Sequence, residues 1–145
     1  MKLSTKDRYA TRLMLDLALH SSEGNVKLGD IAKRQQISEK YLWQVAAPLK
    51  MAGLISATPG GNGGYSLVRS PETITVGDII RAVEGDCSLV DCVGSPDSCE
   101  RSADCVVRGV WKNITDQLMK AMDSISLKDM MDRSKTSTAS SMYFI

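Results

Sequence analysis

The four cysteines of this chain lie close together, and they are the residues with the clearest capacity for chemistry. They occur as Cys87-x4-Cys92-x6-Cys99-x5-Cys105 in a chain of 145 residues. The segment between them is rich in serine and aspartate and contains a glycine and a proline, a composition typical of a loop. Thiolates are soft ligands for metal ions and iron–sulfur clusters. The spacing therefore predicts a loop that holds a metal ion or a cluster.

Zinc is one alternative occupant of this loop, and free thiols without a metal are another. Structural zinc sites usually contain a close Cys-x2–4-Cys pair, and only Cys87 and Cys92 approach that spacing. The first residues have no apolar stretch of a secretory signal, and no apolar run reaches the ~18 residues that span a membrane. We therefore expect a cytoplasmic protein with no membrane contact, in which cysteines stay reduced and bind metals more often than they form disulfides.

The net charge of +1 conceals an uneven distribution of charge along the chain. Residues 1–58 contain nine Lys and Arg against five Asp and Glu, whereas residues 59–105 contain three against eight. A basic N-terminal part and an acidic cysteine loop suit a protein that meets a polyanion with one end only.

The basic N-terminal part is predicted to contain three helices. An apolar stripe with helical spacing follows the capping residue Ser4, and further helices are expected over 28–36 and 39–52. Ser38 caps the third helix and Gly53 follows its end. Two helices joined by so short a turn indicate a helix-turn-helix, although an ordinary helical hairpin has the same pattern.

A glycine-rich hairpin is expected directly after the third helix. The strand signals at 54–58 and 65–68 flank the turn sequence Pro-Gly-Gly-Asn-Gly-Gly. A hairpin in this place indicates a winged helix. The turn is not a nucleotide-binding loop, because it lacks the Gly-Lys-Ser/Thr ending.

The C-terminal part is predicted to be helical. Thr75 caps a fourth helix that Gly85 ends, and the longest helix covers about 106–125. Its apolar residues follow the spacing of a short coiled-coil seam, which favours pairing with a second copy over intramolecular packing: Val107, Trp111, Ile114, Leu118, Ala121 and Ile125. A short helix is expected after Ser126, followed by a mobile tail over about 134–141.

These elements predict a mainly α fold with a small β-hairpin: a winged helix-turn-helix domain plus a long C-terminal dimerisation helix. We assign residues 1–85 to the DNA-binding domain and 86–105 to the cysteine loop. Residues 106–133 form the dimerisation helix and a short terminal helix, and 134–145 form the tail.

In this order, several short motifs resemble the bacterial winged-helix regulators that include IscR, NsrR and CymR. The resemblance covers nearly the whole chain. It rests on Met1–Lys6 with Arg8-Tyr9, Ile37-Ser38 with Tyr41-Leu42 and Gln44, Ala52–Leu54, Gly63–Tyr65, Ile74–Ile80 with Glu84-Gly85, and Cys105 followed by Trp111. It implies a homodimeric DNA-binding repressor or activator and not an enzyme. A small redox enzyme or electron carrier is the third class considered, and the winged-helix pattern and the lack of a Cys-x2-Cys pair argue against it.

The resemblance also implies the ligands of an iron–sulfur cluster. The three ligating cysteines of the cluster-binding branch match Cys92, Cys99 and Cys105, and we expect [2Fe–2S] in preference to [4Fe–4S]. The fourth ligand is open between Cys87 and Asp7. The IscR-like pattern has a histidine where this chain has Arg108. The NsrR-like pattern has an acidic residue where this chain has Arg8, with Asp7 one position earlier.

The DNA-reading positions depart from the IscR-like branch as well. That branch often has Glu where this chain has Trp43 and Arg where it has Pro59, so the resemblance implies a different operator preference. The expected contacts to grooves and phosphates are Ser38, Lys40, Tyr41 and Gln44 of the third helix, together with Arg8, Lys50, Asn62 and Gly63. The ring of Tyr41 could instead pack in the core.

Two functions follow from the resemblance. The first is a regulator that binds a palindromic operator and senses cluster supply, redox state or nitric oxide through the loop. The second is a CymR-like repressor without a cluster, controlled by a metabolic enzyme as its protein partner or by a thiol switch. The apolar end Met142–Ile145 resembles the tail of that branch.

Overall fold

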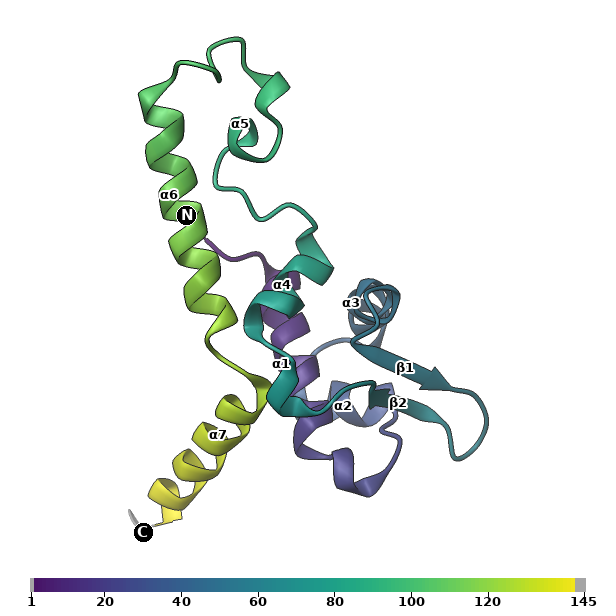
Figure 1. The fold of residues 1–145 in the computed structure, drawn as a ribbon. Coiled ribbons are helices and arrows are strands. Elements are labelled where there is room, and N and C mark those ends of the chain that lie inside the picture. The colour runs from purple at the N-terminus through teal and green to yellow at the C-terminus, as the bar shows by residue number, and fades with distance from the viewer. Residues whose placement is uncertain (1, 143–145) are drawn as a thin grey trace.

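The computed structural model describes residues 2–142 and places a body of helices and a hairpin at the base of one long helix (Figure 1). The body contains α1 (Thr5–Leu19), α2 (Leu28–Gln35), α3 (Glu39–Met51), β1 (Ile55–Thr58), β2 (Gly64–Leu67) and α4 (Val76–Glu84). The rest contains α5 (Asp91–Gly94), α6 (Val106–Asp123) and α7 (Leu127–Met142), and 3-10 turns lie at Ser21–Glu23, Pro71–Thr73 and Pro96–Ser98. The expected fold class, mainly α with a small β-hairpin, is confirmed.

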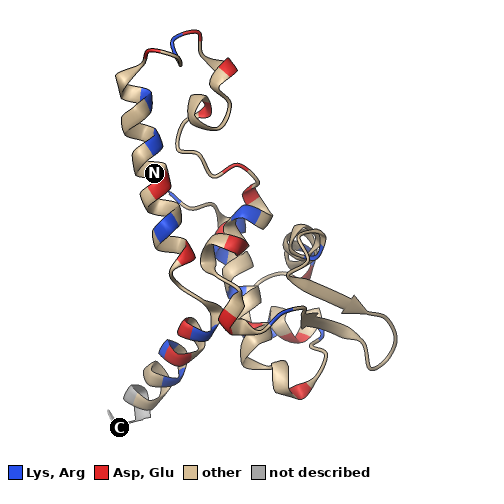
Figure 2. Ribbon diagram, in the orientation of Figure 1, with Lys and Arg blue, Asp and Glu red and all other residues tan. Residues whose placement is uncertain are grey.

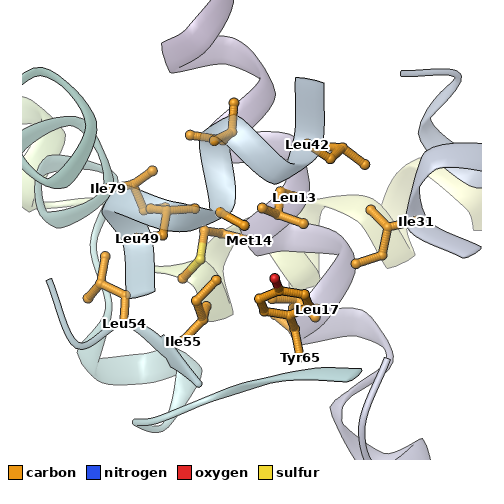
Figure 3. Packing of buried hydrophobic residues seen from close by; sticks show 14 of the residues in the cluster. Leu13, Met14, Leu17, Ile31, Leu42, Leu49, Leu54, Ile55, Tyr65 and Ile79 are labelled. Carbon is orange, nitrogen blue, oxygen red and sulfur yellow. The ribbon is translucent and has the colours of Figure 1, made fainter. Parts of the chain in front are cut away.

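The core of the body is built around α1, whose apolar stripe is fully enclosed. Leu13, Met14 and Leu17 are at most 1% exposed. Figure 3 shows them among side chains of α2, α3, α4 and the hairpin: Ile31, Leu42, Leu49, Ile79, Leu54, Ile55 and Tyr65. Each fully buried aliphatic side chain contributes about 1.5–3 kcal/mol relative to exposure. The core therefore fixes how α3 sits in the body and which of its faces points outward.

The turn between α2 and α3 is set by backbone conformation and by one buried charge. Gln36 ends α2 in the left-handed region with φ 54°, so the chain turns within two residues before Ser38. Asp16 of α1 is 1% exposed and accepts two hydrogen bonds from Arg34 (2.7 and 3.1 Å) and one from Gln35 (2.9 Å). A buried carboxylate needs such partners, so the network holds the end of α2 against α1.

The hairpin is an antiparallel pair that is fastened to the body along one side. Its register runs from Ile55 opposite Leu67 to Thr58 opposite Gly64. Val26, just before α2, exchanges both backbone hydrogen bonds with Tyr65 (2.9 and 2.7 Å). The strands are therefore held in place, and only the turn between them extends beyond the body.

The helix α6 rises from the body and has the cysteine loop at its far end (Figure 1). Its base is fixed where the chain passes α4: the Val76 N–H donates to Ile125 O at 2.9 Å, and the Leu127 N–H donates to Ile74 O at 2.8 Å. Leu127 is fully buried. The winged body and the long helix are thus joined by backbone pairing as well as by side chains.

The last helix is longer than expected. The prediction of a short helix followed by a tail over 134–141 is wrong in its helix length, because α7 continues to Met142. Ser126 and Asp129 form reciprocal capping bonds (2.9 and 3.0 Å), and α7 packs on α1. A capped and docked first turn allows a helix to continue through Ser and Thr residues of low intrinsic propensity. Tyr143, Phe144 and Ile145 of the predicted apolar tail lie outside the described residues.

Acidic and basic residues are distributed unevenly over the elements (Figure 2). The cysteine loop carries Asp and Glu at intervals, whereas α6 and α7 alternate the two signs. Within residues 2–142, no helix has the length and hydrophobicity to cross a membrane.

Candidate nucleic-acid interface and cysteine loop

The outer face of α3 carries the predicted DNA contacts. Leu42, Val45, Ala46 and Leu49 are buried, which leaves Lys40, Trp43, Gln44 and Lys50 exposed on the other side. The helix begins at Ser38, whose hydroxyl accepts a hydrogen bond from the Tyr41 N–H at 3.2 Å. The side chain of Ser38 therefore has a capping role whether or not it touches DNA.

Tyr41 faces the body more than it faces solvent. Its ring meets the edge of Tyr9 at a centroid distance of 5.3 Å and an angle of 87°. The Arg12 guanidinium lies 5.5 Å from the Tyr9 ring centre. This stack joins α3 to α1, so the packing role of Tyr41 has direct support, and its contact to DNA stays a prediction. Arg8 is exposed one turn before Arg12 on α1.

The tip of the hairpin depends on one close approach of the backbone. Asn62 is exposed, and its carbonyl accepts a hydrogen bond from the Asn25 side chain at 3.3 Å. Gly63 is buried, and a Cβ placed on it would lie 2.0 Å from Thr58 O. The Gly63 N–H already donates to Gly60 O at 3.1 Å. We therefore expect Gly63 to serve DNA binding through the shape of the turn.

A groove of about 1040 Å³ separates the hairpin from α2 and α3. Lys27, Lys33 and Lys50 line it, together with two acidic residues of the helices, Asp30 and Glu39. The ring of Trp43 also lines the groove and meets Tyr65 of β2 edge-on, at 6.3 Å and 83°. From the sequence, Trp43 was notable only because the IscR-like branch often has Glu at this position. Its bracing by the wing residue Tyr65 depends on tertiary packing that no local signal reveals.

The cysteine loop is a largely irregular segment between α4 and α6. All four thiols are free; Cys99 is exposed, and Cys87, Cys92 and Cys105 are partly buried. Within the described residues, no three His, Cys, Asp or Glu side chains are gathered as a metal site. That Cys92, Cys99 and Cys105 act together as cluster ligands stays a prediction. Binding of the metal ion or cluster is what draws the ligands of such a site together.

Two of the three expected ligands are nevertheless tied to one another through Arg108. The Cys105 Sγ accepts a hydrogen bond from the Arg108 N–H at 3.4 Å and so caps α6. The Arg108 Nε donates to the Cys92 carbonyl at 2.7 Å. Arg108, at the position of the histidine in the IscR-like pattern, holds the α5 segment beside the start of α6. The donor set, three thiols on one loop, fits an iron–sulfur cluster chemically.

The two candidates for a fourth ligand border one cavity. Asp7 and Cys87 both line a space of about 380 Å³ between the N-terminal residues, the end of α4 and α6. Asp7 is 4% exposed, and its Oδ1 has no hydrogen-bond partner among the described residues, while its Oδ2 accepts from the Ser4 N–H. Burial raises the pKa of the Cys87 thiol, against the opposing influence of Arg81. Cys87 is therefore mainly a neutral thiol near pH 7.

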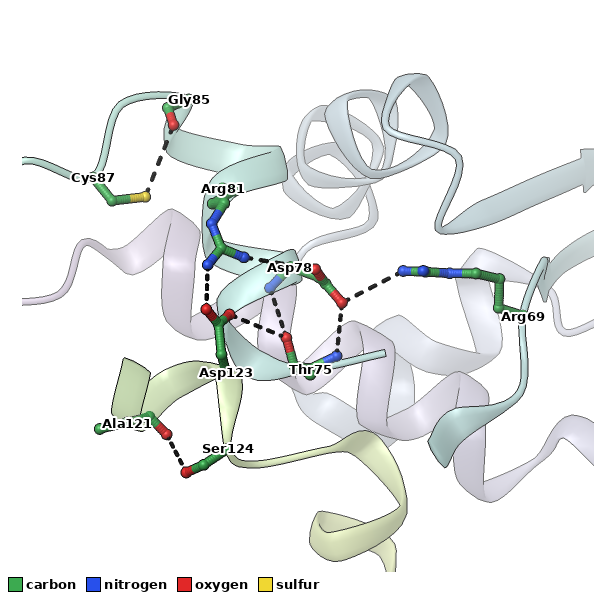
Figure 4. Close-up of polar contacts among 9 residues, drawn as sticks. All are labelled: Arg69, Thr75, Asp78, Arg81, Gly85, Cys87, Ala121, Asp123 and Ser124. Carbon is green, nitrogen blue, oxygen red and sulfur yellow. Dashed lines mark hydrogen bonds and ion pairs between the residues drawn. The ribbon is translucent and has the colours of Figure 1, made fainter. Parts of the chain in front are cut away.

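A charged network connects α4 to the base of α6 (Figure 4). Arg81 contacts both Asp78, its neighbour on α4, and Asp123 at the end of α6, and these contacts raise the pKa of Arg81. Thr75 Oγ1 lies 3.5 Å from Asp123 Oδ1. Gly77 leaves room for that carboxylate, since a Cβ there would lie 1.9 Å from the same oxygen. The network therefore fixes the base of α6 to the winged body.

Curated relatives share sequence along most of the chain. Protein rrf2 of Nitratidesulfovibrio vulgaris is 40% identical over 131 residues, covering 90% of this chain and 87% of that protein. The HTH-type transcriptional regulator IscR of Aliivibrio salmonicida is also 40% identical over 131 residues, covering 90% and 77%.

Solved structures share the fold. The structure of T. potens IscR superposes with a TM-score of 0.77 at 39% identity, covering 94% of this chain and 90% of that one. CymR, the global cysteine regulator of B. subtilis, gives a TM-score of 0.75 at 38% identity, covering 92% and 98%. Residues 3–133 match the Rrf2 family, described as an iron-dependent transcriptional regulator. The chain therefore belongs to the Rrf2 family of winged-helix, DNA-binding transcription regulators and is not an enzyme.

Proposed function

We propose that the protein is a cytoplasmic homodimer that binds a palindromic operator and responds to an iron–sulfur cluster held by Cys92, Cys99 and Cys105. The observation that carries this proposal is the position of the thiols. All of them lie in the one segment between the winged body and α6, and Arg108 ties Cys92 to the cap of α6 at Cys105. A ligand bound there would act on the connection between the DNA-binding and pairing parts of the molecule.

Each part of the chain has a separate task in this proposal. The exposed face of α3 enters the major groove, and the wing and the basic residues of α1 lie on the phosphates. When bound, the cluster supplies a redox- and nitric-oxide-sensitive group, and [2Fe–2S] is favoured over [4Fe–4S]. Cys87 and Asp7 are the two candidates for the fourth ligand, and they border one cavity between the N-terminal residues, the end of α4 and α6.

A cluster-free regulator of the CymR kind is the second candidate. Its support is that CymR and IscR resemble this fold to a similar degree. In that case a thiol switch or a metabolic enzyme acting as protein partner would carry the signal.

The two candidates separate in protein purified without oxygen. We expect visible charge-transfer bands with matching iron and sulfide contents, and we expect Cys92→Ala to lose both the bands and the cluster-dependent change in operator affinity. Ser98→Ala, a substitution of similar size in the same loop, is the control and should keep both. A colourless, iron-free protein after reconstitution, or a Cys92→Ala variant that still responds fully to cluster loading, would favour the second candidate.

A further inference from the structure

We propose that Trp43 is a specificity-determining residue that contacts the C5-methyl group of a thymine in the major groove. It would thereby select T·A over C·G at one position of each half-site. This inference rests on the DNA-binding function of the chain and specifies how α3 reads a sequence.

The first observation is the exposure of a large apolar ring on the recognition helix. Trp43 is 58% exposed, whereas Tyr41, the other aromatic residue of α3, packs against Tyr9. Trp43 shares the outer face of α3 with Lys40 and Lys50. The second helix of a helix-turn-helix lies in the major groove, so side chains on this face meet base edges.

The second observation is that the ring is held in place from behind. Trp43 meets Tyr65 edge-on at 6.3 Å and 83°, and Tyr65 is 9% exposed and bonded through its backbone to Val26. A ring braced by a buried neighbour loses little rotamer freedom when it binds. Tyr65 contacts one side of the indole, and the ring as a whole stays 58% exposed to a ligand in the groove.

The third observation is the charge of the groove that Trp43 lines. Lys27, Lys33 and Lys50 line the same groove and can position a phosphate strand between the helix and the wing. Asp30 and Glu39 line it too, so the groove is only mildly basic. We assign positioning to the lysines and sequence discrimination to the ring.

The chemistry of indole determines which base it favours. Tryptophan has one N–H donor and no acceptor, so it cannot accept a hydrogen bond from the amino group of cytosine or adenine. Thymine alone presents a methyl group in the major groove, and its O4 is an acceptor. Trp43 therefore favours thymine on both counts and disfavours cytosine.

The test begins with selection of binding sites from a randomised duplex library by the full-length protein. Duplexes are then made in which each selected thymine is replaced by deoxyuridine, and cytosine at the same position by 5-methylcytosine. We expect deoxyuridine at the contacted position of one half-site to weaken binding about three- to fivefold, the effect of one buried methyl group. We expect 5-methylcytosine to recover part of the binding lost with cytosine.

Variants assign the effect to the ring. Trp43→Ala should bind thymine and deoxyuridine duplexes equally, with an unchanged salt dependence because no charge is lost. Trp43→Glu should shift the selected base toward cytosine, whose amino group a carboxylate accepts. Met51→Ala is the control, since Met51 is an apolar residue of α3 that is 89% exposed, and it should keep the discrimination. Trp43→Phe keeps an aromatic ring at this position, so it is a control for misfolding of the alanine variant. It should keep part of the discrimination between thymine and deoxyuridine.

Two results would overturn the inference: a wild-type protein indifferent to deoxyuridine at every thymine, or discrimination that persists in Trp43→Ala. A wild-type protein that selects no DNA at all would refute the DNA-binding function instead, so the two failures are distinguishable.

Discussion

Tyr65 is the residue at which the core, the wing and the recognition helix meet. It lies on β2 opposite Ala57, its backbone pairs with Val26, and its ring borders the core and the edge of Trp43. Its phenol group is mostly buried, and burial raises the pKa of Tyr65. A buried tyrosine resists ionisation because the charged form loses its hydration. Ionisation of Tyr65 is therefore disfavoured in the folded protein.

A pH dependence of stability follows from this raised pKa. The unfolded chain releases the Tyr65 proton near the usual pKa of about 10, whereas the folded chain retains it to higher pH. The stability contribution is thus fully present below about pH 10 and is lost as the pH rises through the folded pKa. We expect Tyr65→Phe to show a shallower loss of unfolding free energy between pH 9 and pH 11 in denaturant titrations. An identical slope in both proteins would contradict this account.

At the scale of the elements, the wing is a short hairpin whose tip leaves no room for an added side chain at one position. Its two strands pair over four residues each, and the chain returns through Gly63 directly against the Thr58 carbonyl. A backbone oxygen cannot move aside as the end of a side chain can. The shape of the tip therefore depends on the absence of a side chain at this one position.

Paired alanine substitutions test this requirement. We expect Gly63→Ala to distort the tip, lower stability by about 1–3 kcal/mol as overpacking does, and weaken DNA binding. Gly61→Ala is the control, because a Cβ on Gly61 meets nothing within 4 Å, and both properties should be preserved. Thermal unfolding and binding titrations on the same duplex measure the two effects. Equal behaviour of the variants would mean that the tip is more pliable than the structure indicates.

The elements differ in how far local sequence predicts them. Capping residues Ser4, Ser38 and Thr75 predicted three helix starts within one residue, because their hydrogen bonds are local. The extent of α7 was missed, because it depends on docking against α1. The role of the loop thiols as cluster ligands stays a prediction. The spacing of the cysteines indicates only which ligands are available. The path of the loop depends on contacts between residues distant in sequence, such as the hydrogen bond from Arg108 to the Cys92 carbonyl.

At the scale of the whole molecule, α6 presents an apolar face that the described residues leave open. Val107 is 57% exposed, Trp111 40% and Ile114 41%, and Val106 and Val110 are exposed beside them. The opposite side of the helix carries the Lys112–Asp116 ion pair and faces water. The predicted seam residues Leu118 and Ile125 are half-buried nearer the body. An apolar stripe that continues outward from a packed base suits a second copy of α6 better than solvent.

Substitution on this stripe tests the homodimer. We expect Ile114→Glu to be monomeric at micromolar concentrations, because pairing would bury the new charge without a partner. The monomer should keep binding to a half-site and lose the added affinity for a palindrome. In a dimer, binding of one winged body raises the effective concentration of the second at the other half-site. Lys112→Glu, about 160° around the helix, is the control and should remain dimeric. Light scattering after gel filtration gives the mass. A dimeric Ile114→Glu protein would place the pairing surface elsewhere. The cysteine loop could then no longer control the distance between the two winged bodies through α6.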